Sequence, residues 1–273
     1  MKISMHKRLV RRIRNTLAPV LTALAVALAV FPVSAGATGR TIRVGVNIDY
    51  GISTVGGSDT GFAKDYLREI QKRTDDTYVY VSGSAQELAK KFAAGEIDLI
   101  PCVTGSELDV WSRMAGESGF SGELALSSFS LMTKFAAVYV RGSSDVAFQD
   151  LSTLKSKRIG YLTEDETKYF PSGNFITPEL RSAEFVAYNT EQQMRSDFES
   201  GKLDAVAKDC FRTWTDEMIV YQMSTEECFF MADAENSAIL RDIDAAVAGI
   251  SMTNSAFSSG LYNKYVAKYG AQR

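Results

Sequence analysis

The residues able to perform acid–base or metal chemistry are few in this 273-residue chain. Its single histidine, His6, lies in a basic N-terminal segment that we expect to be removed. A chain without imidazole cannot use a Ser-His-Asp or Cys-His mechanism or bind a metal through histidine. Three carboxylates, Glu107, Asp109 and Glu164, could serve as a general acid or base. We nevertheless expect a protein that is not an enzyme and that uses no metal and no cofactor.

Three cysteines supply the thiol chemistry of the sequence. In an oxidising compartment Cys210 and Cys228 could form a disulfide, which would leave Cys102 as a free thiol. The alternative is three buried thiols that pack as small apolar side chains.

The N-terminal segment has the features of a secretory signal. Six basic residues and no acid precede an apolar run from Leu17 to Val33, and Val33-Ser34-Ala35 offers small residues to a signal peptidase. Residues 1–35 are therefore predicted to be a cleaved signal peptide, with an uncleaved membrane anchor as the alternative. We expect the mature protein to be soluble, in the periplasm or outside the cell.

Removal of this segment would leave an acidic protein. The whole chain has 30 Lys+Arg and 33 Asp+Glu, so a mature chain without the six N-terminal bases has 24 bases, 33 acids and a net charge of −9. An acidic surface repels phosphate groups, so nucleic acids and anionic membranes are poor candidates for partners.

The remaining chain alternates strand-like and helix-like segments, which favours an α/β fold with mainly parallel sheets. One unit of this pattern occurs twice, because residues 84–98 align with residues 190–204 at a constant offset of 106. The two copies share a helix N-cap, a terminating glycine and a following acid, in the pairs Ser84/Thr190, Gly95/Gly201 and Asp98/Asp204. The repeat predicts two similar lobes, each a mainly parallel sheet flanked by helices, and both aspartates are interpreted as structural.

Two strand-like segments, 136–141 and 228–232, lie outside the repeated unit. We expect them to cross between the lobes as a two-strand hinge, with a ligand cleft between the lobes. On this interpretation residues 41–141 and 229–273 form lobe 1, and residues 142–228 form lobe 2.

Several short motifs follow one another in a specific order over residues 41–270. They are Arg43-Val44-Gly45-Val46, Gly61-Phe62-Ala63-Lys64-Asp65-Tyr66-Leu67, Gly95-Glu96-Ile97-Asp98-Leu99-Ile100, Phe129-Ser130-Leu131-Met132, Tyr139-Val140-Arg141, Arg158-Ile159-Gly160, Gly201-Lys202-Leu203-Asp204-Ala205-Val206 and Lys268-Tyr269-Gly270. In this order they resemble the extracellular solute-binding proteins of family 3. The resemblance implies a type 2 periplasmic-binding fold that captures an amino-acid-like solute for an ABC importer.

The resemblance also suggests which residues contact the ligand. Asp209, at the end of a parallel strand, matches the acid that binds a ligand ammonium, and Tyr50 matches an aromatic wall. Asp109 stands where the family has an arginine for the ligand carboxylate, and Arg113 is the candidate substitute. Further candidates for ligand contact are Thr104, Ser106, Trp111, Phe129 and Thr163.

A second anion site of the family is also altered here. The resemblance implies an anion-binding helix N-terminus after the strand at residues 158–162, but the chain has three successive acids there, Glu164, Asp165 and Glu166. They disfavour a bound carboxylate and favour a cationic, amine-bearing ligand. Helix capping by these acids is the alternative interpretation.

Three functions remain open at this point. The first is a monomeric solute-binding protein that closes around an amine-bearing small molecule and delivers it to an ABC permease. The second is a stand-alone sensory domain that signals to a membrane kinase or cyclase. The third is an enzyme of the same fold, a dehydratase or a peptidoglycan-cleaving enzyme.

Overall fold

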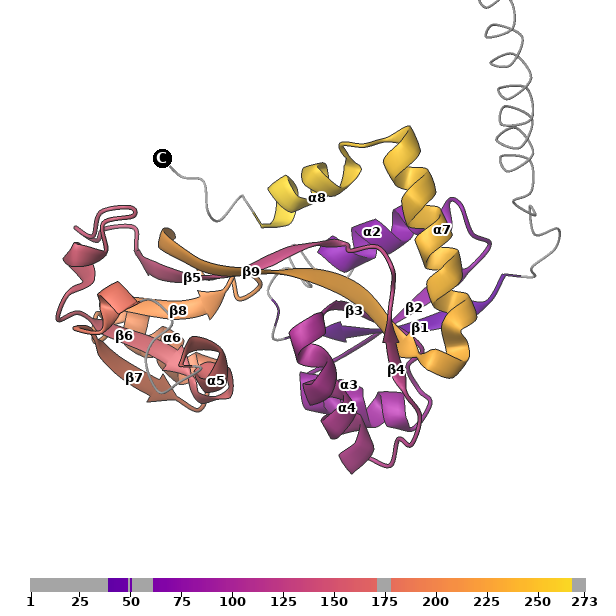
Figure 1. Ribbon diagram of the computed structural model, residues 1–273, viewed down its shortest axis with the longest axis horizontal. Coiled ribbons are helices and arrows are strands. Elements are labelled where there is room, and N and C mark those ends of the chain that lie inside the picture. The colour runs from indigo at the N-terminus through magenta and orange to yellow at the C-terminus, as the bar shows by residue number, and fades with distance from the viewer. Residues whose placement is uncertain (1–38, 49, 51–60, 171–177, 267–273) are drawn as a thin grey trace, which may run out of the picture. The chain divides into compact units, whose positions relative to one another are not determined.

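A computed structural model describes residues 39–48, 50, 61–170 and 178–266 of the chain (Figure 1). The predicted signal peptide, residues 49 and 51–60, and the C-terminal motif Lys268-Tyr269-Gly270 lie outside the described residues. Open sheets flanked by helices confirm the predicted α/β class. Within the described residues no helix combines the length and the apolar character that a bilayer crossing requires.

The first repeated unit is a small parallel sheet with its connecting helices, β1 (Thr41–Asn47), α2 (Phe62–Gln71), β2 (Thr77–Gly83), α3 (Ala85–Ala93) and β3 (Ile100–Thr104). β1 pairs with β2 in parallel, and Val44 of β1 bridges in parallel to Leu99, just before β3. The first strand of the unit therefore lies between the second and the third.

The second repeated unit has the same arrangement, with β6 (Arg158–Leu162), α5 (Glu166–Tyr169), β7 (Glu184–Tyr188), α6 (Glu191–Glu199) and β8 (Ala205–Asp209). Its first strand, β6, pairs in parallel with β7 on one side and with β8 on the other. The common strand order confirms the duplication that the sequence predicts.

The local signals that define the repeat act as predicted in both copies. The Ser84 side chain accepts a hydrogen bond from the backbone N–H of Glu87, and Thr190 caps α6 in the same way. Gly95 and Gly201 have φ values of 68° and 81°, a left-handed conformation that glycine adopts without steric cost.

The repeated acids are structural, because each binds the backbone of a strand. The Asp98 carboxylate accepts a hydrogen bond of 2.8 Å from the backbone N–H of Arg43, at β1. The Asp204 carboxylate accepts one of 2.8 Å from the backbone N–H of Arg158, at β6. Each acid thus fastens the segment after the repeated helix to the first strand of its own unit.

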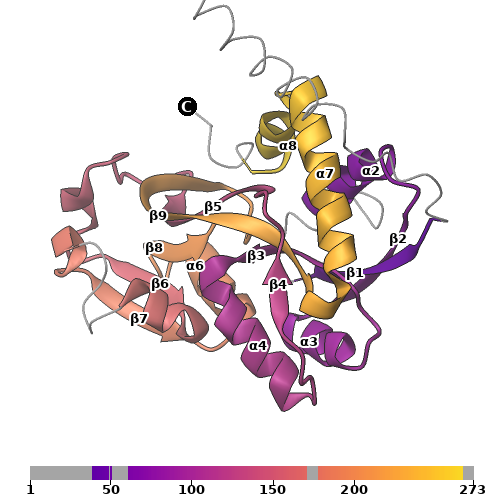
Figure 2. The ribbon, with the colours of Figure 1, turned by 45° about the vertical axis from the view of Figure 1, so that its right-hand side comes forward.

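Two long strands, β5 (Met132–Arg141) and β9 (Glu217–Asp233), run through the second sheet and join the units (Figures 1 and 2). The strand order is β3-β9-β5-β8-β6-β7, and β4 (Leu124–Leu126) also pairs with β9. The β5–β9 ladder shifts register twice, so that Met223 and Val220 of β9 have no partner on β5. Only the last part of β9 was predicted, because the stretch before it, Ser224–Glu227, is polar and mostly half-exposed or exposed.

The remaining helices pack on the first unit. α7 (Ser237–Thr253) and α8 (Phe257–Tyr265) contact α2, and the rings of Tyr66 and Phe257 lie 5.4 Å apart. α4 (Leu108–Glu117), which no sequence signal predicted, packs against α3. The division of the chain into lobes 1 and 2 stays a prediction.

Candidate ligand-binding site

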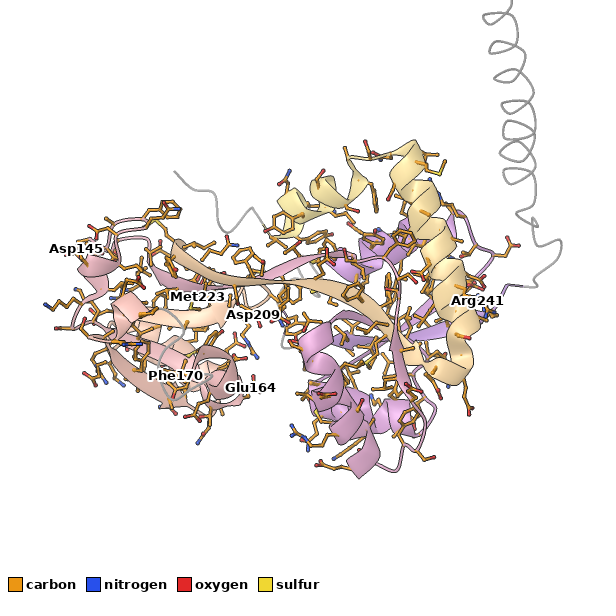
Figure 3. All side chains as sticks on the ribbon, in the orientation of Figure 1. Asp145, Glu164, Phe170, Asp209, Met223 and Arg241 are labelled. Atoms are coloured by element: carbon orange, nitrogen blue, oxygen red, sulfur yellow. The ribbon has the colours of Figure 1, made fainter. Side chains whose placement is uncertain are left out.

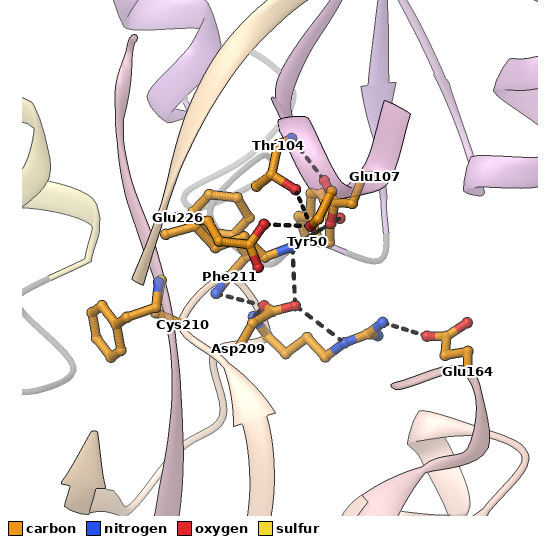
Figure 4. Close-up of polar contacts among 12 residues, drawn as sticks. Tyr50, Thr104, Glu107, Glu164, Asp209, Cys210, Phe211 and Glu226 are labelled. Atoms are coloured by element: carbon orange, nitrogen blue, oxygen red, sulfur yellow. Dashed lines mark hydrogen bonds and ion pairs between the residues drawn. The ribbon is translucent and has the colours of Figure 1, made fainter. Parts of the chain in front are cut away.

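A buried ammonium lies where the crossing strand β5 meets side chains of both repeated units. Lys134 of β5 has a side chain that is only 4% exposed. Its Nζ lies 2.6 Å from a carboxylate oxygen of Glu107, which follows β3, and 3.4 Å from Asp209, at the end of β8 (Figure 4). It also donates a 3.4 Å hydrogen bond to the hydroxyl of Tyr50. We call Lys134, Glu107, Asp209 and Tyr50 the Lys134 cluster.

Two aromatic rings complete the surroundings of this ammonium. The Lys134 Nζ lies 5.0 Å from the ring centroid of Tyr50 and 5.2 Å from that of Phe211. The two rings contact each other edge to face at 5.1 Å. Rings at this distance attract a cation through their quadrupoles, so the ammonium is stabilised by carboxylates and by π faces together.

The turn after β3 holds Glu107 in place. The backbone N–H of Thr104 donates to Glu107 Oε2 at 3.0 Å, which leaves Oε1 to face Lys134. The hydroxyls of Thr104 and Ser106 lie 3.1 Å apart, and Ser106 donates a short hydrogen bond to Glu226, which faces Lys134 across the β5–β9 ladder. A local turn and a cross-strand contact therefore fix the position of the carboxylate.

Asp209 is held by the backbone that follows β8, beside the crossing strands (Figure 3). Its Oδ1 accepts hydrogen bonds from the N–H groups of Phe211 at 2.9 Å and of Arg212 at 3.3 Å. The Arg212 guanidinium pairs with Glu191 at 2.7 Å and with Glu164 at 2.5 Å, and its Nε lies 4.0 Å from Asp209. A second buried cation thus lies directly beside the Lys134 cluster.

The carboxylates keep these cations charged. Burial lowers the pKa of Lys134, but Asp209 and Glu107 more than reverse this, and its pKa is well above the ordinary value. Burial likewise opposes the charge of Arg212, yet Asp209 and its neighbouring acids raise the pKa of the guanidinium. The two cations pair with four carboxylates, those of Glu107, Asp209, Glu164 and Glu191, so these groups together carry a net negative charge.

A second buried lysine lies nearby but has a different environment. Lys208 of β8 is 1% exposed, and its Nζ lies 3.0 Å from the Glu217 carboxylate and 3.7 Å from the ring centroid of Tyr139. It also donates to the backbone carbonyl of Arg212. Burial lowers the pKa of Lys208 and raises the pKa of Glu217.

Four of the residues singled out from the sequence lie in or directly beside the Lys134 cluster. Asp209 and Tyr50 belong to it, and Thr104 and Ser106 form the turn that positions Glu107. In the structure the Asp209 carboxylate is already engaged by protein groups, namely by Lys134 and two backbone amides.

The other four candidates have other surroundings. Trp111 packs in the apolar core with α3, and Arg113 is exposed on α4, as is Asp109. Phe129 is 48% exposed, and its N–H donates to Asp244 of α7. The Thr163 hydroxyl donates to the backbone carbonyl of Tyr188, while its neighbour Glu164 reaches Arg212.

The central residues of the site were missed in the sequence. Lys134, Phe211 and Arg212 were not singled out, and Glu107 was noted only as a possible acid or base. One signal was present, because Lys134 interrupts an otherwise apolar strand and is followed by Phe135. A lysine inside a buried strand indicates a paired charge.

The three cysteines are buried free thiols in the structure. Burial raises the pKa of both Cys102 and Cys210 to about 12. The Cys210 sulfur accepts a hydrogen bond from the N–H of Phe135 at 3.4 Å. The disulfide between Cys210 and Cys228 stays a prediction.

The chain matches no protein-family model, and no curated protein matches it by sequence. Solved structures do match its fold. The probable amino-acid ABC transporter extracellular-binding protein ytmK of Bacillus subtilis has 16% identity and a TM-score of 0.64, with 84% of this chain and 98% of that chain covered. An ancestral arginine-binding protein bound to arginine has 17% identity and a TM-score of 0.57, with 84% and 99% covered.

A third match is an ancestral amino acid-binding protein described as a precursor of cyclohexadienyl dehydratase. It has 16% identity and a TM-score of 0.56, with 83% of this chain and 95% of that chain covered. At these identities the likeness concerns the fold. The chain has the two-lobed α/β fold of the periplasmic amino-acid-binding proteins.

Proposed function

We propose that this protein is an exported, monomeric solute-binding protein whose lobes close around a small molecule and deliver it to an ABC importer. One observation carries the proposal. Tyr50 and Glu107 from the first unit, Lys134 from a crossing strand and Asp209 from the second unit converge on one buried, charged cluster. Groups from both lobes at the hinge are what a protein needs if ligand binding is to stabilise one lobe arrangement.

The sequence predicts an amine-bearing, amino-acid-like solute, whereas the carboxylates nearest Lys134 and Arg212 are already paired with these two cations. One of the fold neighbours is described as bound to arginine. A solute amine that approached Asp209 or Glu107 would have to compete with Lys134 for the same oxygens.

The contacts of the acidic residues support binding rather than catalysis. Both carboxylate oxygens of Glu107 are engaged, one by Lys134 and one by the Thr104 amide. Glu164 is paired with Arg212, and Asp109 is exposed on α4. A general acid or base needs a carboxylate that can exchange a proton with substrate. Glu107 and Glu164 are already paired with protein cations, and Asp109 lies on the exposed face of α4 rather than in the Lys134 cluster.

A ligand screen tests the proposal. Purified protein is heated with single amino acids, polyamines, short peptides and small carboxylic acids, and the melting temperature is recorded. A solute at about 100 times its dissociation constant should raise the melting temperature by about 5–10 °C, because it binds only the folded state. If no solute in the panel does so, solute binding is not supported.

The hit is then titrated by calorimetry against two variants. Tyr50→Ala should weaken binding at least about tenfold, because the ring forms one wall of the cluster. Arg241→Ala, on the exposed face of α7, is the control and should bind as the wild type does. Equal binding by all three proteins would contradict the placement of the site.

A further inference from the structure

The surroundings of the Lys134 Nζ are those that recognise a primary amine. Glu107 and Asp209 supply acceptor oxygens at 2.6 and 3.4 Å, and the Tyr50 hydroxyl accepts at 3.4 Å. Two rings, those of Tyr50 and Phe211, lie about the cation at 5.0 and 5.2 Å. Charge-assisted hydrogen bonds and aromatic faces are the usual means of binding an ammonium ligand. Here the ammonium comes from the protein itself.

We propose that the Lys134 cluster is an ammonium-binding site that the protein fills with its own lysine. It follows, given the proposed function, that the wild-type protein rejects solutes that place an amine between Glu107 and Asp209. It selects solutes that lack an amine at this position. Lys134 is then a specificity-determining residue.

The tether makes Lys134 a strong competitor. A group held on the same chain competes with an effective concentration in the millimolar range or above, so a free amine must exceed this before it displaces the lysine. Displacement would also leave the Lys134 charge without its two carboxylates in a buried setting, which is strongly unfavourable. The backbone of Lys134 has little freedom to move its side chain out of the cluster, because β5 is paired on one side with β8 and on the other with β9.

An exposed group of the same residue types provides a control. Lys264 lies 2.6 Å from Asp65, with its Nζ 4.7 Å from the ring centroid of Tyr265, but its side chain is 56% exposed. Water competes for this ammonium, and a single carboxylate holds it. Removal of Lys264 should therefore leave no selective site for an amine.

The test is chemical rescue of Lys134→Ala. This variant lacks the three outer methylenes and the amine of lysine, which n-propylammonium replaces atom for atom. We expect propylammonium to bind Lys134→Ala at least about tenfold more tightly than it binds the wild type or Lys264→Ala, and to raise the melting temperature of Lys134→Ala alone. Propionate, of similar length and opposite charge, should have no such effect.

Two outcomes would overturn the proposal. One is equal stabilisation of Lys134→Ala by propylammonium and propionate, and the other is equal stabilisation of variant and wild type by propylammonium. If Lys134→Ala does not fold unaided, the yield of folded protein on refolding with each additive gives the same comparison. Lys134→Met, which fills the space without charge, should not respond to propylammonium.

The rescue is independent of the solute screen. A cluster that binds propylammonium in Lys134→Ala while the wild type binds nothing in the panel would support the ammonium site and contradict the proposed function. If a solute binds the wild type but propylammonium does not rescue Lys134→Ala, the result would support the proposed function and contradict the ammonium site.

Discussion

Two buried lysines on neighbouring strands have pKa values that are shifted in opposite directions. Lys134 of β5 faces two carboxylates, Glu107 and Asp209, and its pKa is well above the ordinary value. Lys208 of β8, which is just as buried, has one directly paired carboxylate, Glu217, and its pKa is lowered. Desolvation favours the neutral amine in both cases. Around Lys134 the carboxylates outweigh this effect, whereas around Lys208 the charges of Glu217, Asp209 and Glu191 do not.

The origin of the partners differs as well. The carboxylate and the carbonyl that bind Lys208 lie nine and four residues away along the chain, so one local segment supplies them. Glu107 and Tyr50 lie 27 and 84 residues from Lys134. A local pair suits a structural role within one lobe, whereas a cluster gathered from distant segments suits a site that responds to the arrangement of the lobes.

The largest loss of stability is expected from a change in the Lys208–Glu217 pair. Glu217→Gln should lower the free energy of unfolding by about 3–5 kcal/mol, because it leaves Lys208 as a buried cation without its directly paired carboxylate. Urea unfolding measures the loss. The double variant Lys208→Met with Glu217→Gln removes the charge as well and should regain a large part of the stability. No recovery would mean that the charge pairing does not cause the loss.

A smaller loss of stability is expected from a change in the Lys134 cluster. Glu107→Gln should cost about 1–2 kcal/mol, because Asp209 still neutralises Lys134 and the amide can still accept a hydrogen bond. The same urea measurement applies, with Glu217→Gln as the reference. A loss equal to that of Glu217→Gln would show that the second carboxylate gives no redundancy.

The pH dependence of stability should differ in sign between the two lysines. The pKa of Lys208 lies below the ordinary 10.5, so the unfolded chain binds more protons and the Lys208 contribution to stability rises with pH up to about 10.5. The pKa of Lys134 lies above 10.5, so its contribution is complete below this pH and is lost as pH rises beyond it.

Urea unfolding of the wild type, Lys134→Met and Lys208→Met across this pH range measures both slopes by difference, each at most about 1.4 kcal/mol per pH unit. Slopes of the same sign for the two variants would contradict the comparison.

The smallest change in stability is expected from a substitution away from both Lys134 and Lys208. Arg113→Ala on the exposed face of α4 should change the unfolding free energy by less than about 0.5 kcal/mol. A larger loss would show that Arg113 takes part in an interaction like those of the two lysines.

The sequence predicted what local rules govern. Caps at Ser84 and Thr190 and left-handed glycines at 95 and 201 depend on neighbours within a few residues, so the repeat and the two-lobed fold could be recognised. The strand after the first repeated helix forms at Ile100–Thr104, beyond Asp98, whose carboxylate accepts a hydrogen bond from the backbone of β1.

The candidate site could be predicted only in part. Asp209 and Tyr50 were singled out through the resemblance to the solute-binding family, and Asp209 also through its place at the end of a strand. Lys134 was not, since its partners come from three distant segments and no spacing along the chain connects them. A pattern of residue types also does not show that an acid expected to bind a ligand is already bound by the protein.

The two unpaired residues of β9 give the ribbon of crossing strands a point of low torsional stiffness. Met223 and Val220 lie opposite the stretch of β5 that starts at Ala136, and Ala136 faces Asp209 across the neighbouring ladder. Bulges interrupt pairing and increase local twist, so the ribbon yields there before it yields elsewhere. The bulged stretch and the Lys134 cluster are therefore neighbours in the sheet, because Ala136 pairs with Asp209, and a change of twist in the ribbon would move the backbone beside this carboxylate.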